Sequence, residues 1–115
     1  MGVDLEFKPV EWVGTALDDL RSFPDDARRI AGFQIGRVQA GRMPHDWKPM
    51  SVVGPGVNEI RVRTSREHRV FYVAKFADAV YVLHGFEKKA QRTTLADIEV
   101  GRRRYREVVR RRREA

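Results

Sequence analysis

The N-terminal part of the chain shows two different hydrophobic periods in succession. Residues 4–9 alternate weakly between polar and apolar and end at Pro9, which predicts a short first strand. Apolar residues then recur at three- and four-residue spacings from Val10 to Leu20, and this spacing predicts an amphipathic helix. The helix is expected to stop near Phe23.

A second helix is expected to begin at Pro24, which is followed by two aspartates. Proline suits the first turn of a helix, and carboxylates suit its positive dipole end. A further apolar stripe leads to Gly41, where the helix is expected to close. Gly32 and Gly36 each weaken the helix by about 1 kcal/mol relative to alanine, which indicates close packing at these positions.

In the C-terminal half of the chain, short segments rich in β-branched and aromatic residues replace the helical spacing. A proline-punctuated connection over residues 42–50 leads into them. The segments are Val57–Arg63, His68–Phe76 and Ala79–Phe86, and they predict an antiparallel meander. Thr94 with Asp97 forms a capping-box pattern that predicts the start of a last helix. The order of elements predicts an α+β domain whose helices lie on one side of a small antiparallel sheet.

The first hairpin of this meander needs an odd-numbered loop to keep the apolar residues of both strands on one face. A loop at Thr64–Arg66 satisfies this condition. It places Arg61 beside Arg69 on the other face of the sheet.

The second hairpin is expected to turn at Ala77–Asp78, which pairs Tyr72 with Leu83 and Phe71 with His84. The face away from the helices then carries Glu59, Arg61, Arg63, Arg69, Phe71, Lys75, His84 and Phe86. An antiparallel sheet can present a plain solvated face, but adjacent arginines repel each other and the phenylalanines have no core to enter. The mixture favours RNA, because guanidinium groups bind phosphates and aromatic rings stack on bases.

Composition narrows the class of protein. The chain has 115 residues, is 42% hydrophobic and 34% charged, and has no cysteine, which excludes a disulfide framework and a thiolate zinc site. It has no apolar run of the roughly 18 residues that a membrane span needs, and its N-terminus lacks the apolar part of a signal peptide. We expect one cytoplasmic domain over residues 1–115 with no membrane association. Trp12, Phe23 and Phe33 are expected in its core.

The formal net charge of +7 is unevenly distributed. Residues 1–40 have a net charge of −2, residues 41–100 of +3, and residues 101–115 of +6 in an arginine-rich helix or tail. Clustered cations gain affinity for phosphates by releasing counterions, which indicates a polyanionic partner. An acidic protein would fit the same distribution.

Three motifs in this order resemble a known toxin family. They are the EIR of the segment WKPMSVVGPGVNEIRVR, the RVFY of HRVFYVAKF, and the LHGFEKK of VYVLHGFEKKAQRT. Together they resemble the phage-derived HigB-like toxins of the RelE/ParE superfamily, from about Val10 to Tyr105. The resemblance implies a RelE/ParE-like α+β toxin with two N-terminal helices on one face of a curved antiparallel sheet and a C-terminal helix.

The resemblance also implies an activity and partners. It implies the toxin of a type II toxin–antitoxin system that arrests growth by inhibiting translation. Its enzymatic activity would be that of a metal-independent mRNA endoribonuclease (an mRNA interferase and hydrolase) acting on the ribosome. The implied partners are mRNA, the ribosome and a helix-turn-helix, HigA-like antitoxin, with DNA contacted only through the antitoxin complex. No cofactor is implied, and the spacing of His45 and His68 gives no metal site.

Residue by residue, the motifs identify catalytic candidates. Arg61 and Arg69 match the arginines of the active sheet face, and Lys88 and Lys89 match the basic residues after the last strand. Because arginine stays protonated, Arg61 and Arg69 would clamp phosphate and stabilise the transition state. The expected RNA-binding residues are Lys48, Arg63, Phe71, Phe86, Arg92, Arg102 and Arg103.

Proton transfer requires other groups. His84 is the first candidate because imidazole titrates near neutral pH, and Glu59 or a lysine among other cations follows, with Lys88 and Lys89 as candidates. His84 could instead be a packing histidine at a strand end, and Glu59 a salt-bridge partner that organises Arg61. The arginine tail suits ribosomal RNA, an acidic antitoxin or solvent alone. The alternative functions are a ParE-like poison of DNA gyrase and a nucleic-acid-binding module without enzymatic activity.

Overall fold

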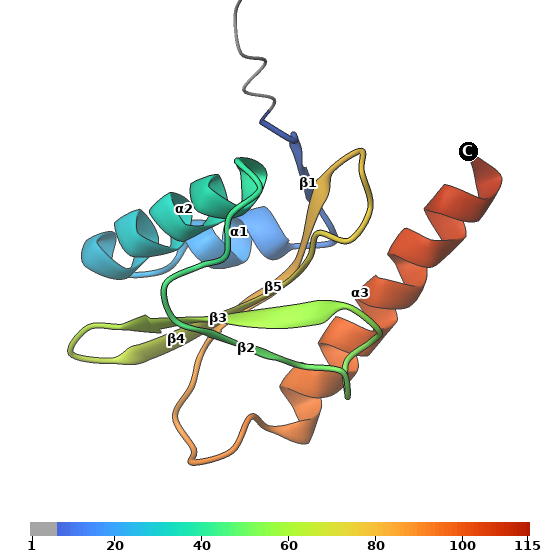
Figure 1. The fold of residues 1–115 in the computed structure, drawn as a ribbon. Helices are drawn as coiled ribbons and strands as arrows, with labels where there is room; N and C mark the ends of the chain where they lie inside the picture. The colour runs from blue at the N-terminus through green and yellow to red at the C-terminus, as the bar shows by residue number, and fades with distance from the viewer. Residues whose placement is uncertain (1–6) are drawn as a thin grey trace, which may run out of the picture.

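Within residues 7–115, five strands form one mixed sheet, and helices cover both of its faces (Figure 1). The computed structural model describes residues 7–115. Its elements are β1 (Val10–Trp12), α1 (Ala16–Arg21), α2 (Asp25–Gln39), β2 (Trp47–Pro49), β3 (Val57–Arg63), β4 (Glu67–Val73), β5 (Val80–Glu87) and α3 (Leu95–Glu114). The strand order is β1-β5-β4-β3-β2. The strands are antiparallel neighbours except β1, which runs parallel to β5, so the prediction of a purely antiparallel sheet was wrong.

The first two predicted elements are placed differently by the structure. Residues 4–6 of the expected first strand lie outside the described residues, and residues 7–9 are not a strand. The apolar residues after them form β1 instead of a helix, because Val10 pairs with Val80 and Trp12 with Val82. Gly14 then turns the chain with φ +59°, and α1 begins only at Ala16.

The connection before the meander contains a further strand. β2 pairs with β3 at the edge of the sheet, with Trp47 opposite Ile60. An edge strand tolerates Pro49 because one side of its backbone needs no partner in the sheet. The hydrophobic pattern did not predict this strand, because the prolines around it indicate a loop.

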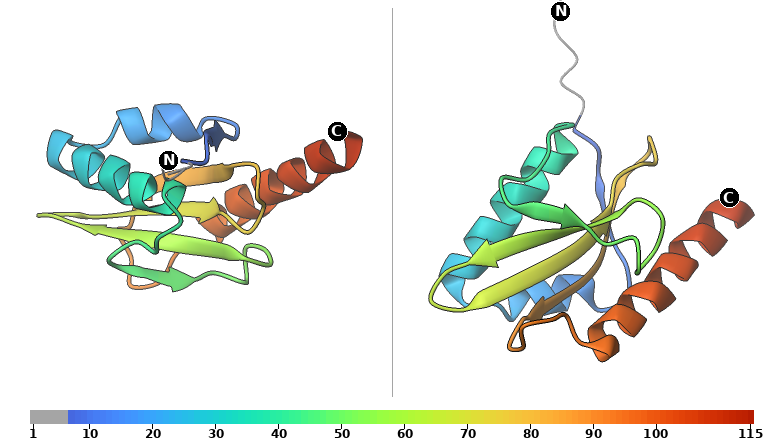
Figure 2. Two further views of the ribbon diagram at one scale, coloured as in Figure 1. Left: turned by 45° about the horizontal axis from the view of Figure 1, so that its top comes forward. Right: turned by 60° about the horizontal axis from the view of Figure 1, so that its bottom comes forward.

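The first core lies between the sheet and the two N-terminal helices, as expected (Figure 2). Ala27, Ala31 and Ile35 of α2 face buried residues of β3, β4 and β5. Phe23 is buried in this core and Trp12 packs against it at half-burial. Phe33 is 61% exposed, so its prediction as a core residue was wrong.

The second core fills the opposite face of the sheet under α3. Phe71 is fully buried and Phe86 is 9% exposed, so the expected solvated aromatic face does not exist there. A bulge contributes to this core, since Phe71 pairs with His84 but Tyr72 pairs with Val82 and not with Leu83. The bulge leaves Leu83 without a partner on β4 and directs its side chain into the second core.

α3 begins as the capping-box pattern predicts. The Thr94 hydroxyl oxygen accepts a hydrogen bond from the Asp97 backbone N–H at 3.2 Å. The helix continues for 20 residues and carries the arginine-rich segment. Among the helices of residues 7–115, none combines the length and apolarity that crossing a bilayer requires.

Gly101 allows α3 to approach the sheet closely. A Cβ atom at this position would lie 2.8 Å from Val53 Cγ1 and 2.9 Å from the Phe71 ring. We expect Gly101→Val to lower the free energy of unfolding by about 1–3 kcal/mol through overpacking, measured by urea denaturation. Ala96→Val on the exposed first turn of the same helix is the matched control, and an equal loss in both variants would contradict close packing at Gly101.

His68 makes the stability of the first core sensitive to acid. It is 3% exposed, its ring centroid lies 4.4 Å from that of Phe23, and its Nδ1 has no hydrogen-bond partner in the described part of the chain. Burial lowers the pKa of His68 below its ordinary value of 6.5, with the charge of Glu87 opposing the shift. The unfolded chain therefore binds more protons at and below pH 6.5 than the folded protein.

The free energy of unfolding should consequently fall as the pH decreases below 6.5, by at most about 1.4 kcal/mol per pH unit for this one proton. Urea unfolding at pH 7.5, 6.5 and 5.5 measures the slope. His68→Leu should flatten it, because the buried imidazole is then gone. A slope that is identical in wild type and His68→Leu would contradict this assignment.

Candidate nucleic-acid interface

A cationic pocket opens on the α3 side of the sheet. Its volume is about 500 Å³, and its walls come from β2, β3, β4, the loop after β5 and the first turn of α3. It is lined by Lys48, Met50, Arg61, Arg63, Glu67, Arg69, Lys88, Gln91, Arg92, Thr93 and Ile98. Six of these side chains are cations and one is a carboxylate, so the pocket wall has an excess of positive charge that attracts anions.

Strand register brings the charged residues together. Lys48 of β2 lies opposite Glu59 of β3, and Arg61 of β3 lies opposite Arg69 of β4. Glu59 and Arg61 are two residues apart on β3 and therefore share one face of the sheet. The pair Lys48–Glu59 consequently lies next to the pair Arg61–Arg69 on that face. The predicted juxtaposition of Arg61 and Arg69 is confirmed, because the hairpin turns at residues 64–66 as its odd length requires.

Glu59 is the buried counter-charge beneath this pocket. Its side chain is 0% exposed, and its Oε1 lies 3.3 Å from Arg69 Nε and 3.9 Å from Arg61 Nε. The Thr93 hydroxyl donates a hydrogen bond of 3.3 Å to Glu59 Oε2. Glu59 Oε1 and Arg69 Nε lack good hydrogen-bond geometry despite their closeness, so the attraction between them is mainly that of opposite charges. This position matches the interpretation of Glu59 as the residue that organises the arginines.

Arg69 is held firmly in place. Its side chain is 4% exposed, its Nη2 donates to Glu67 Oε1 at 2.6 Å, and its Nη1 donates to the carbonyl oxygen of His68 at 3.2 Å. The hydrogen bond from Arg69, followed by its charge, lowers the pKa of Glu67 below the ordinary value. Arg69 therefore contributes positive potential to the pocket wall while most of its donors are already used.

Arg61 and Arg63 are more accessible to a ligand. Arg61 is 27% exposed with Asp46 Oδ1 at 3.7 Å, and Arg63 is 53% exposed with Asp46 Oδ2 at 3.1 Å. Lys48 makes no side-chain hydrogen bond or ion pair with any residue between 7 and 115. An incoming phosphate would compete with Asp46 for the two arginines and would meet Lys48 directly.

The loop after β5 supplies the remaining cations. Lys88 Nζ donates to the carbonyl oxygens of Ala90 at 2.9 Å and Gln91 at 2.6 Å, so it shapes the loop. Lys89 is exposed and lines an adjoining cavity of about 260 Å³ rather than the cationic pocket. Arg92 lines both cavities.

His84 lies outside the cationic pocket. Its Nε2 is 2.8 Å from Asp97 Oδ1 of α3, and its Nδ1 is 3.4 Å from Asp19 Oδ2 of α1. Its ring stacks on Phe86 with a centroid distance of 4.9 Å. The structure thus places His84 as a bridge between two helices, in accordance with the packing alternative.

Four other RNA-binding candidates do not line this pocket. Phe71 and Phe86 are packed in the second core under α3, which corrects their predicted exposure, and Phe86 only borders the adjoining cavity. Arg102 donates to the carbonyl oxygen of Val52 at 2.8 Å and pairs with Glu99. Arg103 is exposed on α3.

Sequence reasoning missed three polar contributors to the pocket region, Asp46, Glu67 and Thr93. Glu67 could have been found from register, because it lies opposite Arg63 across the first hairpin. Asp46 and Thr93 come from irregular segments, where no periodicity indicates the direction of a side chain.

Comparison with known proteins identifies the family. No curated protein matches the chain. A family model described as phage-derived protein Gp49-like (DUF891) matches residues 18–106, which include α2, every strand from β2 to β5 and the whole cationic pocket. The match supports the RelE/ParE-type ancestry that the EIR, RVFY and LHGFEKK motifs indicate, at a coarser level than the HigB-like branch. The chain therefore belongs to the phage-derived Gp49-like family of RelE/ParE-type toxins.

Proposed function

We propose that this protein is the toxin of a type II toxin–antitoxin pair and that it cleaves mRNA on the ribosome through its cationic pocket. The pocket is the observation that carries the proposal. It joins accessible guanidinium and ammonium groups around a buried carboxylate that holds two arginines in place. A pocket of this charge suits the phosphate backbone of RNA.

The proposed reaction is attack of an RNA 2′-oxygen on its neighbouring phosphorus. The bond to the 5′-oxygen breaks, which leaves a 2′,3′-cyclic phosphate and a free 5′-hydroxyl. Arg61 would stabilise the added negative charge on the phosphorus, since its guanidinium faces the pocket and stays protonated. We assign the two proton transfers to the lysines of the pocket wall: Lys48, as the neutral amine, would accept the 2′-hydroxyl proton, and Lys88, as the ammonium, would donate a proton to the departing 5′-oxygen.

The positive charge of the pocket wall favours a reaction in which side chains, and not a divalent cation, stabilise the charge on the phosphate. Six cationic side chains repel a metal ion, and the buried Glu59 is already close to Arg61 and Arg69. The protein would be metal-independent for this reason. We further propose that a HigA-like helix-turn-helix antitoxin silences the toxin, and that DNA is contacted only through that complex.

A nucleic-acid-binding module without enzymatic activity is the second candidate function. The hydrogen bonds and ion pairs that already engage the residues expected to transfer protons favour this candidate. His84 is engaged with Asp97 outside the pocket, and Lys88 already donates to two carbonyl oxygens. Such a module would bind RNA with a strong salt dependence and would not cleave it.

Induced expression tests the two candidates against each other. Wild type, Arg61→Ala and Arg21→Ala are compared by growth and by mapping new mRNA 5′ ends within translated regions. Arg21 is an exposed arginine of α1 outside the pocket. We expect arrest and new ends in wild type and Arg21→Ala, and neither in Arg61→Ala.

Other outcomes identify other functions. Growth arrest in all three strains with intact mRNA and damaged DNA would indicate a gyrase poison. Absence of arrest together with salt-dependent RNA binding would indicate the binding module.

A further inference from the structure

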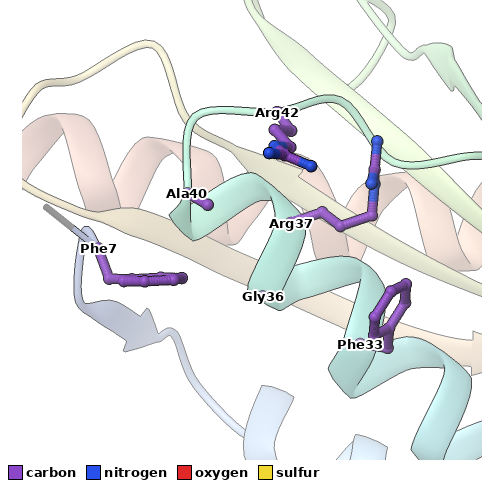
Figure 3. A pocket seen from close by; sticks show the side chains of 6 residues that line it. All are labelled: Phe7, Phe33, Gly36, Arg37, Ala40 and Arg42. Carbon is purple, nitrogen blue, oxygen red and sulfur yellow. The ribbon is translucent and has the colours of Figure 1, made fainter. Parts of the chain in front are cut away.

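The outer face of α2 carries an apolar groove (Figure 3). It has a volume of about 450 Å³ and is lined by Phe7, Phe33, Gly36, Arg37, Ala40 and Arg42. The rings of Phe7 and Phe33 lie on either side of Gly36, and each residue is 61% exposed. Large exposed aromatic side chains grouped in this way mark an interaction surface.

Two glycines on the same helix have no packing partner among residues 7–115 that would explain them. Gly32 and Gly36 are one turn apart, and a Cβ atom added at either position would meet no atom of the described residues within 4 Å. Glycine in a helix interior is destabilising relative to alanine. Neither glycine has the φ above +20° that favours glycine. Their small size therefore allows a second helix to approach closely from outside, because the distance between packed helices depends on the side chains at the contact.

The charged residues beside the groove indicate what kind of partner helix would bind there. Arg37 and Arg42 border the apolar groove, and Arg42 makes no side-chain hydrogen bond or ion pair within residues 7–115. Carboxylates on a partner would complement both arginines. A second copy of this chain is less suitable, because two molecules of net charge +7 repel each other.

We infer that the α2 groove binds an amphipathic helix of an acidic partner protein. Small apolar residues of that helix would pack on Gly32, Gly36 and Phe33, and its carboxylates would reach Arg37 and Arg42. The groove and the cationic pocket lie on different sides of the sheet, since α2 packs on the first core and the pocket opens beside the second. The inference does not rest on the proposed function, and a bound partner would leave the pocket open.

Three synthetic helical peptides test the inference. They share an apolar face of alanine and leucine and differ only in flanking residues, which are glutamate, glutamine or lysine. At 150 mM salt, calorimetry should show that wild type binds the glutamate peptide at least about tenfold more tightly than the glutamine peptide, and the lysine peptide most weakly. Arg42→Glu should reverse the preference between the glutamate and lysine peptides.

Variants of the groove give a second measurement. Phe33→Glu should weaken binding of the glutamate peptide about tenfold or more, and folding is protected because the side chain is exposed. The double variant Gly32→Ala/Gly36→Ala should raise the melting temperature by several degrees while weakening binding. Glycines retained for packing within this chain would instead make that variant less stable, which would contradict the inference.

Arg61→Ala is the matched control, because it removes a cation from the pocket and leaves the groove intact. Equal binding of all three peptides would overturn the inference, as would loss of binding in Arg61→Ala or unchanged binding in Phe33→Glu. Sedimentation of wild type as a dimer that Phe33→Glu dissociates would also overturn it, in favour of a second copy of the chain.

Discussion

Arg61→Ala is expected to slow cleavage of mRNA by about 10²- to 10³-fold in a purified translation system. This is the effect of removing one preorganised donor that stabilises a developing oxyanion in a closed site. Arg61 is the partly exposed arginine of the cross-strand pair, and its distant contacts with Asp46 and Glu59 leave donors free for a phosphate. The measurement is the initial rate of cleavage on programmed ribosomes, with the melting temperature determined for each variant.

Arg61→Lys separates charge from geometry. Lysine keeps the positive charge but cannot bind a phosphate through two parallel donors, so we expect a rate between those of wild type and Arg61→Ala. Arg21→Ala should cleave at the wild-type rate. Wild-type cleavage by Arg61→Ala with normal folding would show that the reaction occurs elsewhere on the molecule.

Arg69→Ala is expected to act on stability before it acts on activity. Removing Arg69 leaves Glu59 fully buried without its nearest counter-charge, and breaking a buried ion pair in this way costs about 3–5 kcal/mol. The loss should lie near the lower limit, because Arg61 remains 3.9 Å from Glu59 and Thr93 still donates to it. Urea denaturation measures the difference.

Two further variants test the cause. Glu59→Gln combined with Arg69→Ala should recover part of the stability, since the buried charge itself is then gone. Arg63→Ala is the control, because Arg63 is 53% exposed and its pair with Asp46 contributes at most about 1 kcal/mol. Equal losses in Arg69→Ala and Arg63→Ala would show that Glu59 does not depend on Arg69.

The pair Arg61 and Arg69 illustrates what register can predict. Loop length between two strands determines which residues face each other, so the adjacency of the two arginines follows from the sequence. Their different environments do not. Arg69 is buried and bonded to Glu67 and His68, and Arg61 is open to the pocket, because α3 and the loop after β5 cover one part of the face only.

The roles predicted for His84 and the phenylalanines show what strand register cannot predict. Alternation along β4 and β5 correctly pairs Phe71 with His84 and directs Phe71 into the core opposite α1 and α2, whereas His84 also reaches Asp19 of α1. It cannot show that α3 covers this part of the face, which buries Phe71 and pairs His84 with Asp97. Residue type alone predicts a core position for Phe33, which is exposed because it lies outside the face of α2 that buries Ala31 and Ile35.

The sequence by itself determined the local features of this protein. The α2 helix, the capping box at Thr94, the register of the first hairpin and the motifs of a RelE/ParE-type toxin follow from neighbouring residues and short loops. Only the tertiary structure decided that β1 joins β5 in parallel, that α3 closes the second face and that six cations surround one pocket. These features depend on contacts between residues far apart in the chain, and a hydrophobic period specifies the face that is buried but not the element that buries it.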